Sequence, residues 1–156
     1  MCEQLAQQSP LPEQVPTRSA DVVVGNAPDT WGDNLRPTPD DVRREYVRAL
    51  ADPAHAHAIC EEYRALGTID RLHDEVDRVS GLKVRCPLLV LWSGKGPLDT
   101  WYQSQAGPLG IWRQWSDNVS GQAIPGGHFF PEQAPVATAT ALRSVFGASL
   151  LWTDGD

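Results

Sequence analysis

A single histidine stands where this sequence could present a reactive imidazole. Pro125-Gly126-Gly127-His128 follows a short apolar segment and precedes a helical pattern, which is the place at the end of a strand where open α/β sheets carry functional groups. The paired glycines permit a tight backbone beside the imidazole. Because imidazoles titrate near neutral pH, His128 is suited to act as a general base. A histidine that only caps the helix or fills the turn has the same pattern, so both roles stay open.

Three other sets of residues have the composition of reactive sites. Asp99 follows a strongly apolar segment and could orient a histidine, although an acid in a solvated loop has the same pattern. His57 and Glu61 are one helical turn apart, as metal ligands often are. Zinc needs further ligands and supporting residues, so we expect no metal site. Glu61 and Glu62 are adjacent in a helical pattern and face different directions, which argues against a glycosidase pair.

The second half of the chain has the alternating pattern of an α/β protein. Cys86-Pro87-Leu88-Leu89-Val90-Leu91-Trp92 is apolar on both alternating faces, as in a buried parallel strand. Residues 108–118 predict a helix, 122–124 a short strand, and 131–146 a closing helix that Gly147 ends. The order β-α-β-α implies a parallel sheet, yet two strands are too few to bury both of its faces. We therefore expect an incomplete α/β sheet over residues 81–147 and a frayed tail over 148–156.

The first half is rich in proline and in acidic residues. Six prolines among residues 1–40 predict an irregular arm, because proline breaks helices and removes backbone donors. Helical patterns follow, one beginning at Thr38-Pro39-Asp40-Asp41, one between Asp52-Pro53 and Gly67, and one over 68–79. Such helices bury little apolar surface among themselves. Residues 1–80 are therefore expected to form a helical lid over another domain.

Charge and cysteine content limit the partners and the compartment. The net charge is −7, with 15 acidic and 8 basic residues in 1–80 against 5 of each in 81–156. Nucleic acids and anionic membranes bind clustered basic residues, so neither is expected as a partner. Three cysteines without paired spacing argue against disulfides and against a cysteine zinc site. No apolar leader is present and the longest apolar run is 88–92, so a cytoplasmic protein is expected.

Several stretches, in the same order along the chain, resemble the haloacetate dehalogenases of the α/β-hydrolase family. GQAIPGGHFFPEQAPVATATAL (121–142) resembles the segment with that family's catalytic histidine, and CPLLVLWSG (86–94) is similar to its penultimate core strand. PAHAHAICEEYRA (53–65) is similar to the lid segment with a halide-holding tyrosine, and LAQQSPLPE (5–13) to the beginning of the lid. The resemblance implies an α/β fold, namely a helical lid followed by the last parallel strands and helices of an α/β hydrolase.

The resemblance also implies a reaction and two site residues. In that family an aspartate displaces halide from the carbon next to a carboxylate, and a histidine-activated water then hydrolyses the resulting ester. His128 matches the histidine that activates water, and Tyr63 matches the phenol that holds the halide. The implied substrate is a halogenated carboxylic acid, and no cofactor is implied.

The sequence departs from the family at several catalytic positions. No nucleophile pattern of the type Gly-x-Ser-x-Gly or Gly-x-Asp-x-Gly is present. In the family the nucleophile, the triad acid and the substrate-binding arginines precede the lid, and the His-Trp pair that also holds halide aligns here with Met1 and Cys2. The resemblance therefore predicts a fragment that needs an N-terminal half for activity. Alone, it is expected to self-associate through its incomplete sheet.

Two alternatives remain open at this stage. A non-catalytic interaction module would keep the family's residues as a scaffold and would fold stably by itself. An epoxide-hydrolase-like relative would share the fold and the nucleophile but would use lid tyrosines to protonate the epoxide oxygen. Tyr63 is the best placed lid tyrosine, while Tyr46 and Tyr102 are the others in the chain.

Overall fold

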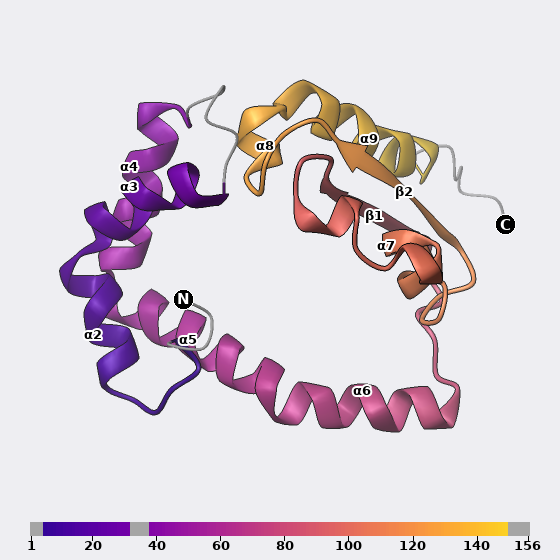
Figure 1. Ribbon diagram of the computed structural model, residues 1–156, viewed down its shortest axis with the longest axis horizontal. Helices are drawn as coiled ribbons and strands as arrows, with labels where there is room; N and C mark the ends of the chain where they lie inside the picture. Colours follow the sequence, from indigo (N-terminus) through magenta and orange to yellow (C-terminus); the bar gives the residue numbers. More distant parts are fainter. Residues whose placement is uncertain (1–4, 32–37, 150–156) are drawn as a thin grey trace, which may run out of the picture. The chain divides into compact units, whose positions relative to one another are not determined.

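The computed structural model describes residues 5–31 and 38–149, which fall into a helical unit and an α/β unit (Figure 1). Among the described residues, the helical unit is built from 5–27 and 38–82 and the α/β unit from 28–31 and 83–149, so the helix over residues 20–31 is divided between the two units. In these described ranges, no helix combines the length and the apolar character that crossing a bilayer requires.

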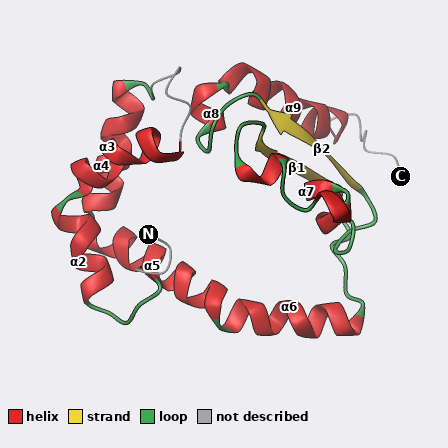
Figure 2. Ribbon diagram, viewed as in Figure 1, coloured by secondary structure: helices red, strands yellow, loops and turns green. Residues whose placement is uncertain are grey.

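The helical unit contains helices throughout, including the stretch predicted to be irregular. Its helices are α2 (Leu11–Arg18), α3 (Ala20–Trp31), α4 (Asp40–Ala51), α5 (Pro53–Gly67) and α6 (Ile69–Ser80) (Figure 2). The irregular arm predicted for residues 1–40 is wrong, because α2 and α3 lie within it. Pro12 occupies the first turn of α2, where a helix does not use the N–H that proline lacks. Pro16 lies inside α2. Both Pro12 and Pro16 are buried, and the apolar surface that they bury offsets the backbone hydrogen bond that is missing at Pro16.

The helices predicted after residue 38 are confirmed as α4, α5 and α6. Asp52 separates α4 from α5, and its carboxylate Oδ1 accepts a hydrogen bond of 2.8 Å from the backbone N–H of Ala54. Pro53 then fills the first helical position of α5. Gly81 ends α6 in the left-handed conformation, with φ of +67°, a geometry that glycine adopts without a steric penalty.

The α/β unit is built on two parallel strands, β1 (Leu88–Ser93) and β2 (Val119–Ile124). The register pairs Leu88 with Val119 and continues to Ser93 opposite Ile124. Gly121 lies in the middle of β2, where a Cβ atom would stand 2.0 Å from the carbonyl oxygen of Val90, so only glycine fits at this close approach. The predicted parallel arrangement is confirmed, and the described sheet has these two strands.

Short helical segments connect and follow the strands. The connection from β1 to β2 contains the 3₁₀ turns Pro97–Asp99 and Gln103–Gln105 and helix α7 (Gly107–Trp112), and α8 (Phe130–Gln133) and α9 (Pro135–Ser149) follow β2. The helix predicted over 108–118 therefore ends early, and the one predicted over 131–146 is divided in two. Gly147 does not end α9, which extends to Ser149, and the rest of the predicted tail lies outside the described residues.

The core of the α/β unit lies between β2 and the helices that follow it. Ile124 is fully buried and packs with Ala134 and Ala141, while Leu91 and Phe130 are partly buried against this cluster. Because Ile124 is the last residue of β2, the core holds the end of the strand from which the turn to His128 departs.

Candidate functional site

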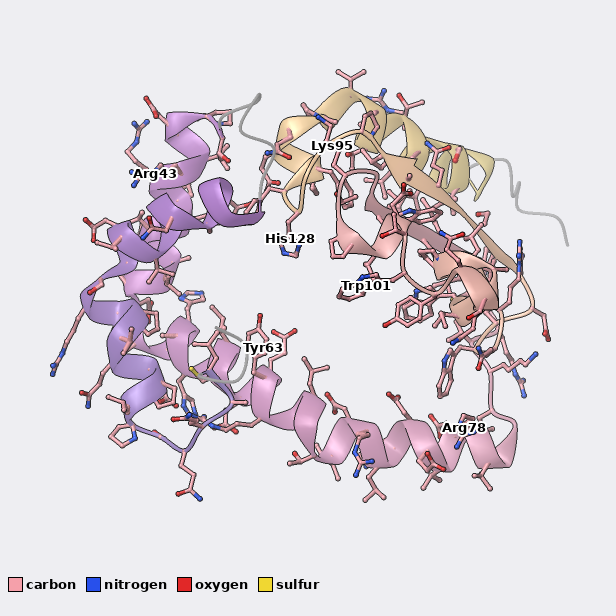
Figure 3. All side chains as sticks on the ribbon, in the orientation of Figure 1. Arg43, Tyr63, Arg78, Lys95, Trp101 and His128 are labelled. Carbon is pink, nitrogen blue, oxygen red and sulfur yellow. The ribbon has the colours of Figure 1, made fainter. Side chains whose placement is uncertain are left out.

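His128 lies in the turn that leaves the carboxyl end of β2. The turn covers residues 125–129, between β2 and α8. The imidazole is exposed and meets the ring of Phe129 edge-on, with ring centroids 5.1 Å apart and an interplanar angle of 87°. Figure 3 shows the side chain projecting from this loop. The predicted location after a strand and before a helix is thus the one observed, while the catalytic role of His128 stays a prediction.

The peptide group between Gly126 and Gly127 is held on both of its polar sides. Its carbonyl oxygen accepts a hydrogen bond of 2.7 Å from the hydroxyl of Ser93, at the end of β1, and another of 3.3 Å from the backbone N–H of Lys95. Its N–H donates to the side-chain Oε1 of Gln133 in α8 at 2.7 Å. Ser93 and Gln133 are 8% and 5% exposed, so water does not compete for these bonds. The backbone directly before His128 is therefore fixed by β1 and α8 together.

Gly126 is required by the shape of this turn. Its φ of +154° lies in a region that residues with a Cβ rarely adopt. A Cβ atom here would stand 3.2 Å from Cβ of Phe130 and 3.3 Å from Oε1 of Gln133, the atom that accepts the hydrogen bond from Gly127. The sequence indicates a tight turn from its two glycines, but it gives no sign that Ser93 and Gln133 anchor that turn. Ser93 could have been noticed only as the polar residue that ends the apolar run of β1, a pattern that does not reveal its hydrogen-bond partner.

Tyr63 lies in α5 of the helical unit and lines a cavity there. The side chain is half-buried, and Figure 3 shows where it lies on the helix. The cavity has a volume of about 510 Å³, within the range of pockets that hold small organic ligands. Most of its lining is apolar and comes from α2, α4, α5 and the segment before α2, including Leu5, Leu11, Val15, Leu50, Ile59 and Cys60. Tyr63 is thus part of the lining of a mainly apolar cavity.

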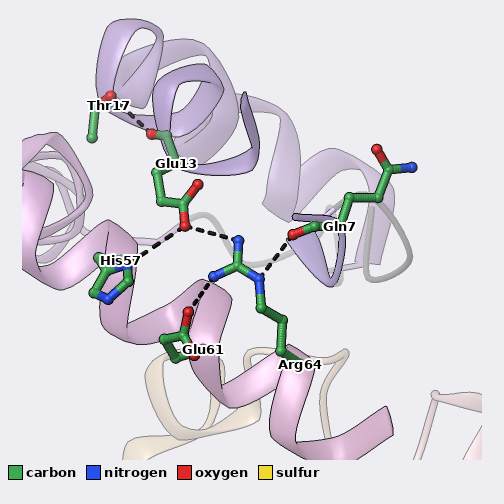
Figure 4. A network of polar contacts seen from close by, with 6 residues as sticks. All are labelled: Gln7, Glu13, Thr17, His57, Glu61 and Arg64. Carbon is green, nitrogen blue, oxygen red and sulfur yellow. Dashed lines mark hydrogen bonds and ion pairs between the residues drawn. The ribbon is translucent and has the colours of Figure 1, made fainter. Parts of the chain in front are cut away.

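Arg64, the residue after Tyr63, is the centre of a network of polar contacts (Figure 4). The guanidinium donates to the carboxylate of Glu13 at 2.8 Å, to that of Glu61 at 2.5 Å and to the backbone carbonyl of Gln7 at 2.8 Å. Burial raises the pKa of Glu13, but the hydrogen bond and the charge of Arg64, together with hydrogen bonds from the backbone and from His57, outweigh it, so the pKa lies below its ordinary value. The network joins α2 and the segment before it to α5, the helix that carries Tyr63.

His128 belongs to the α/β unit and Tyr63 to the helical unit. Met1 and Cys2, which align with the halide-binding His-Trp pair of the dehalogenases, lie outside the described residues.

Comparison with known proteins connects both units to one fold. No family model matches the chain. Fluoroacetate dehalogenase of Burkholderia sp is 34% identical in an alignment 151 residues long that covers 89% of this chain and 44% of the relative. A structure assigned as an α/β hydrolase from Nostoc sp is 37% identical, with a TM-score of 0.78, over 91% of this chain and 47% of its own. One from Pseudomonas aeruginosa, assigned as an epoxide hydrolase, is 34% identical, with a TM-score of 0.79, over 95% and 48%.

The chain has the fold of the C-terminal part of an α/β hydrolase. This fold and the resemblance to the haloacetate dehalogenases, both predicted from the sequence, are thereby confirmed. The chain spans about half the length of the relatives that it matches.

Asp99 follows β1 and is the acid that the sequence offered as a group to orient a histidine. In this chain its carboxylate Oδ1 accepts a hydrogen bond of 2.9 Å from the indole Nε1–H of Trp92, the penultimate residue of β1. Its backbone carbonyl also accepts from the side-chain amide of Gln103 at 2.9 Å. These contacts give Asp99 a structural role, since they hold the loop after β1 against the strand.

The helical unit contains the one group of potential metal ligands found among the described residues. Ligand atoms of Glu13, His57 and Glu61 lie within 4.8 Å of one another, and Nδ1 of His57 is 3.5 Å from Oε1 of Glu13. The guanidinium of Arg64 pairs with both carboxylates, at 2.8 Å and 2.5 Å. A metal ion would have to displace this cation, which favours a structural ion-pair network. The expectation that the chain has no metal site stays a prediction.

Proposed function

We propose that this chain provides the lid and the C-terminal part of a hydrolase that cleaves a carbon–halogen bond next to a carboxylate. An N-terminal half would supply the nucleophile and the acid that orients the histidine. The observation that carries the proposal is the exposed imidazole of His128 at the end of β2, on a turn that Ser93 and Gln133 fix. Identity of 34% with a fluoroacetate dehalogenase supports the choice of reaction.

The proposed reaction has two steps. A carboxylate of the other half attacks the carbon that bears the halogen, the carbon–halogen bond breaks, and halide leaves with the bonding electrons. The phenol of Tyr63 donates a hydrogen bond to the departing halide, in a largely apolar cavity where such a bond is strong. His128 then takes a proton from water, and the resulting hydroxide attacks the carbonyl carbon of the ester. The hydroxy acid leaves with the proton returned from His128, and the carboxyl group of the nucleophile releases the remaining proton of the water to solvent, which regenerates the carboxylate.

Complementation with the N-terminal half of the Burkholderia dehalogenase tests this proposal. The chain alone should release no fluoride from fluoroacetate above background, because general-base assistance alone is about 10²–10⁴-fold and the displacement also needs a nucleophile. The mixture of the two halves should release fluoride catalytically, as a fluoride electrode would record. Steady release by the chain alone, or none by the mixture, would contradict the proposal.

Two variants separate the roles of the site residues in that mixture. His128→Ala should stop the reaction after one fluoride per complex and leave the ester on the nucleophile, where mass spectrometry would detect it. Tyr63→Phe should slow halide departure without slowing ester hydrolysis. His55→Ala is the matched control, since His55 is an exposed lid histidine and should be replaceable without effect.

The epoxide-hydrolase alternative is favoured by the Pseudomonas aeruginosa structure, at 34% identity. The same mixture should therefore also be assayed with an epoxide. Turnover of the epoxide that depends on Tyr63, without fluoride release from fluoroacetate, would favour this alternative. Cooperative unfolding of the chain alone, without turnover in any mixture, would favour the non-catalytic module.

A further inference from the structure

The cavity in the helical unit is large and reaches the surface of the unit. Its volume is about 510 Å³, whereas an apolar cavity of about 150 Å³ already holds a benzene molecule. Pro12, Ala56 and Cys60 line the cavity and are buried. Leu11 and Val15 also line it and are 64% and 56% exposed. A ligand could therefore enter the cavity from solvent and lie against side chains of the interior.

The lining of this cavity suits the apolar part of a ligand. Among the described residues that line it, the polar side chains are those of Gln7, Cys60 and Tyr63, and none is charged. A carboxylate inside the cavity would lose its hydration without gaining a cation, which is costly. An alkyl chain gains free energy when it leaves water for such a lining. The cavity should therefore take an alkyl group and leave a carboxylate outside.

Arg64 does not supply the cation that the lining lacks. It follows Tyr63 in α5, and its guanidinium donates to the carboxylates of Glu13 and Glu61 and to the backbone carbonyl of Gln7 (Figure 4). A carboxylate from a ligand would have to displace one of these acids to pair with Arg64. The network thus keeps this cation occupied.

We propose that the cavity holds an alkyl substituent on the halogen-bearing carbon, so that the site takes 2-halo acids larger than haloacetates. The inference rests on the proposed function, in which Tyr63 holds the departing halide. Because Tyr63 is part of the cavity lining, a halogen held by its phenol leaves the carbon that bears it close to the cavity. A haloacetate has only hydrogen atoms for substituents there and would leave most of the cavity to water.

Straight-chain carboxylates without halogen test the cavity in the full chain alone, because they cannot react. Propanoate, hexanoate and octanoate are titrated by isothermal titration calorimetry. Burial of each further methylene should raise the affinity about two- to fourfold, so octanoate should bind at least tenfold more tightly than propanoate.

Two alanines of α5 provide a matched pair of variants. Ala56→Leu adds carbon atoms at a fully buried position in the lining and should weaken octanoate binding about tenfold. Ala58→Leu makes the same change at an exposed position outside the lining and should leave the affinity within twofold of the unaltered chain. Circular dichroism shows whether both variants fold. Equal affinities of the two folded variants for octanoate would overturn the inference.

Thiol labelling of the unaltered chain gives a measurement that does not depend on any variant. Cys60 lines the cavity, whereas Cys86 is exposed and belongs to the α/β unit. Saturating octanoate should slow the labelling of Cys60 by iodoacetamide at least threefold and leave that of Cys86 unchanged, as peptide mass spectrometry would record. Unchanged labelling of Cys60, or the same affinity for all three acids, would overturn the inference even if Ala56→Leu does not fold.

Turnover in the mixture with the N-terminal half of the Burkholderia dehalogenase separates the two proposals. The substrates to compare are 2-fluorohexanoate and 2-fluoropropanoate, since both carry fluorine on a secondary carbon. The longer acid should have a kcat/KM about tenfold higher, and Ala56→Leu should remove this preference. Octanoate binding that depends on Ala56, without fluoride release from any acid, would overturn the proposed function and leave the ligand class of the cavity intact. Fluoride release without preference for the longer acid would overturn the inference on the cavity alone.

Discussion

Replacing Gln133 by leucine tests whether the turn before His128 is fixed by the contacts described. Gln133 is 5% exposed, and its Oε1 accepts the N–H of Gly127 at 2.7 Å. Leucine is similar in size but offers no acceptor. Because Gly127 is buried as well, water cannot readily take the place of the lost oxygen.

The expected cost follows from leaving one buried donor without a partner. An unsatisfied buried N–H costs about 1–3 kcal/mol, so Gln133→Leu should lower the free energy of unfolding by that amount. Ser93→Ala should cost only about 0.5–1.5 kcal/mol, because the carbonyl of Gly126 keeps the N–H of Lys95 at 3.3 Å. Both side chains act on the same peptide group, so the double variant should cost less than the sum of the two.

Urea unfolding followed by tryptophan fluorescence measures these differences. The α/β unit contains Trp92, Trp101, Trp112 and Trp115, which report on its unfolding. The matched control is Gln114→Leu, the same change at an exposed glutamine, which should stay within about 0.5 kcal/mol of the unaltered chain. An unchanged stability for Gln133→Leu, or a double variant whose cost equals the sum, would refute the account of this turn.

Three further outcomes are expected. Gly126→Ala should destabilise the α/β unit by about 1–3 kcal/mol in the same assay, because φ of +154° strains any residue with a Cβ. Arg64 holds the pKa of Glu13 below its ordinary 4.5, so stability of the helical unit should fall as the pH drops below that value, and Glu13→Gln should flatten this dependence in thermal unfolding by circular dichroism. Iodoacetamide should label exposed Cys86 well before buried Cys60, whose thiol pKa is raised by burial, and equal labelling in peptide maps would contradict the packing of α5.

Local signals were sufficient to predict the elements whose boundaries depend on a few adjacent residues. The apolar run that became β1 was recognisable because both alternating faces are apolar, and Asp52-Pro53 marked one helix end and the next helix start. Helix α2 was missed because proline is read from sequence as a helix breaker. Its tolerance here depends on the burial of Pro12 and Pro16 against the rest of the unit, which the local pattern does not contain.

The lengths of the later helices depend on contacts that the periodicity does not contain. The chain leaves the helical path after Trp112 and forms a bridge between Ser116 and Val84, from a segment far earlier in the sequence. Ala134 adopts a non-helical conformation, with φ of −136° and ψ of 57°, because the residue before a proline is disfavoured in the helical region, and this separates α8 from α9. The side chains that anchor the turn at His128 could not be predicted for the same reason, since Ser93 and Gly126 are 33 positions apart in the sequence.

The register of β1 and β2 limits where this chain can change its length. Successive side chains of a strand point to opposite faces, so inserting or deleting one residue within either strand would reverse the faces and carry the hydroxyl of Ser93 away from the carbonyl of Gly126. The exposed turns over 100–106 bear no such constraint, because they connect the strands without setting their phase. Natural variants of this segment should therefore differ in length between the strands and keep both strands unchanged in length.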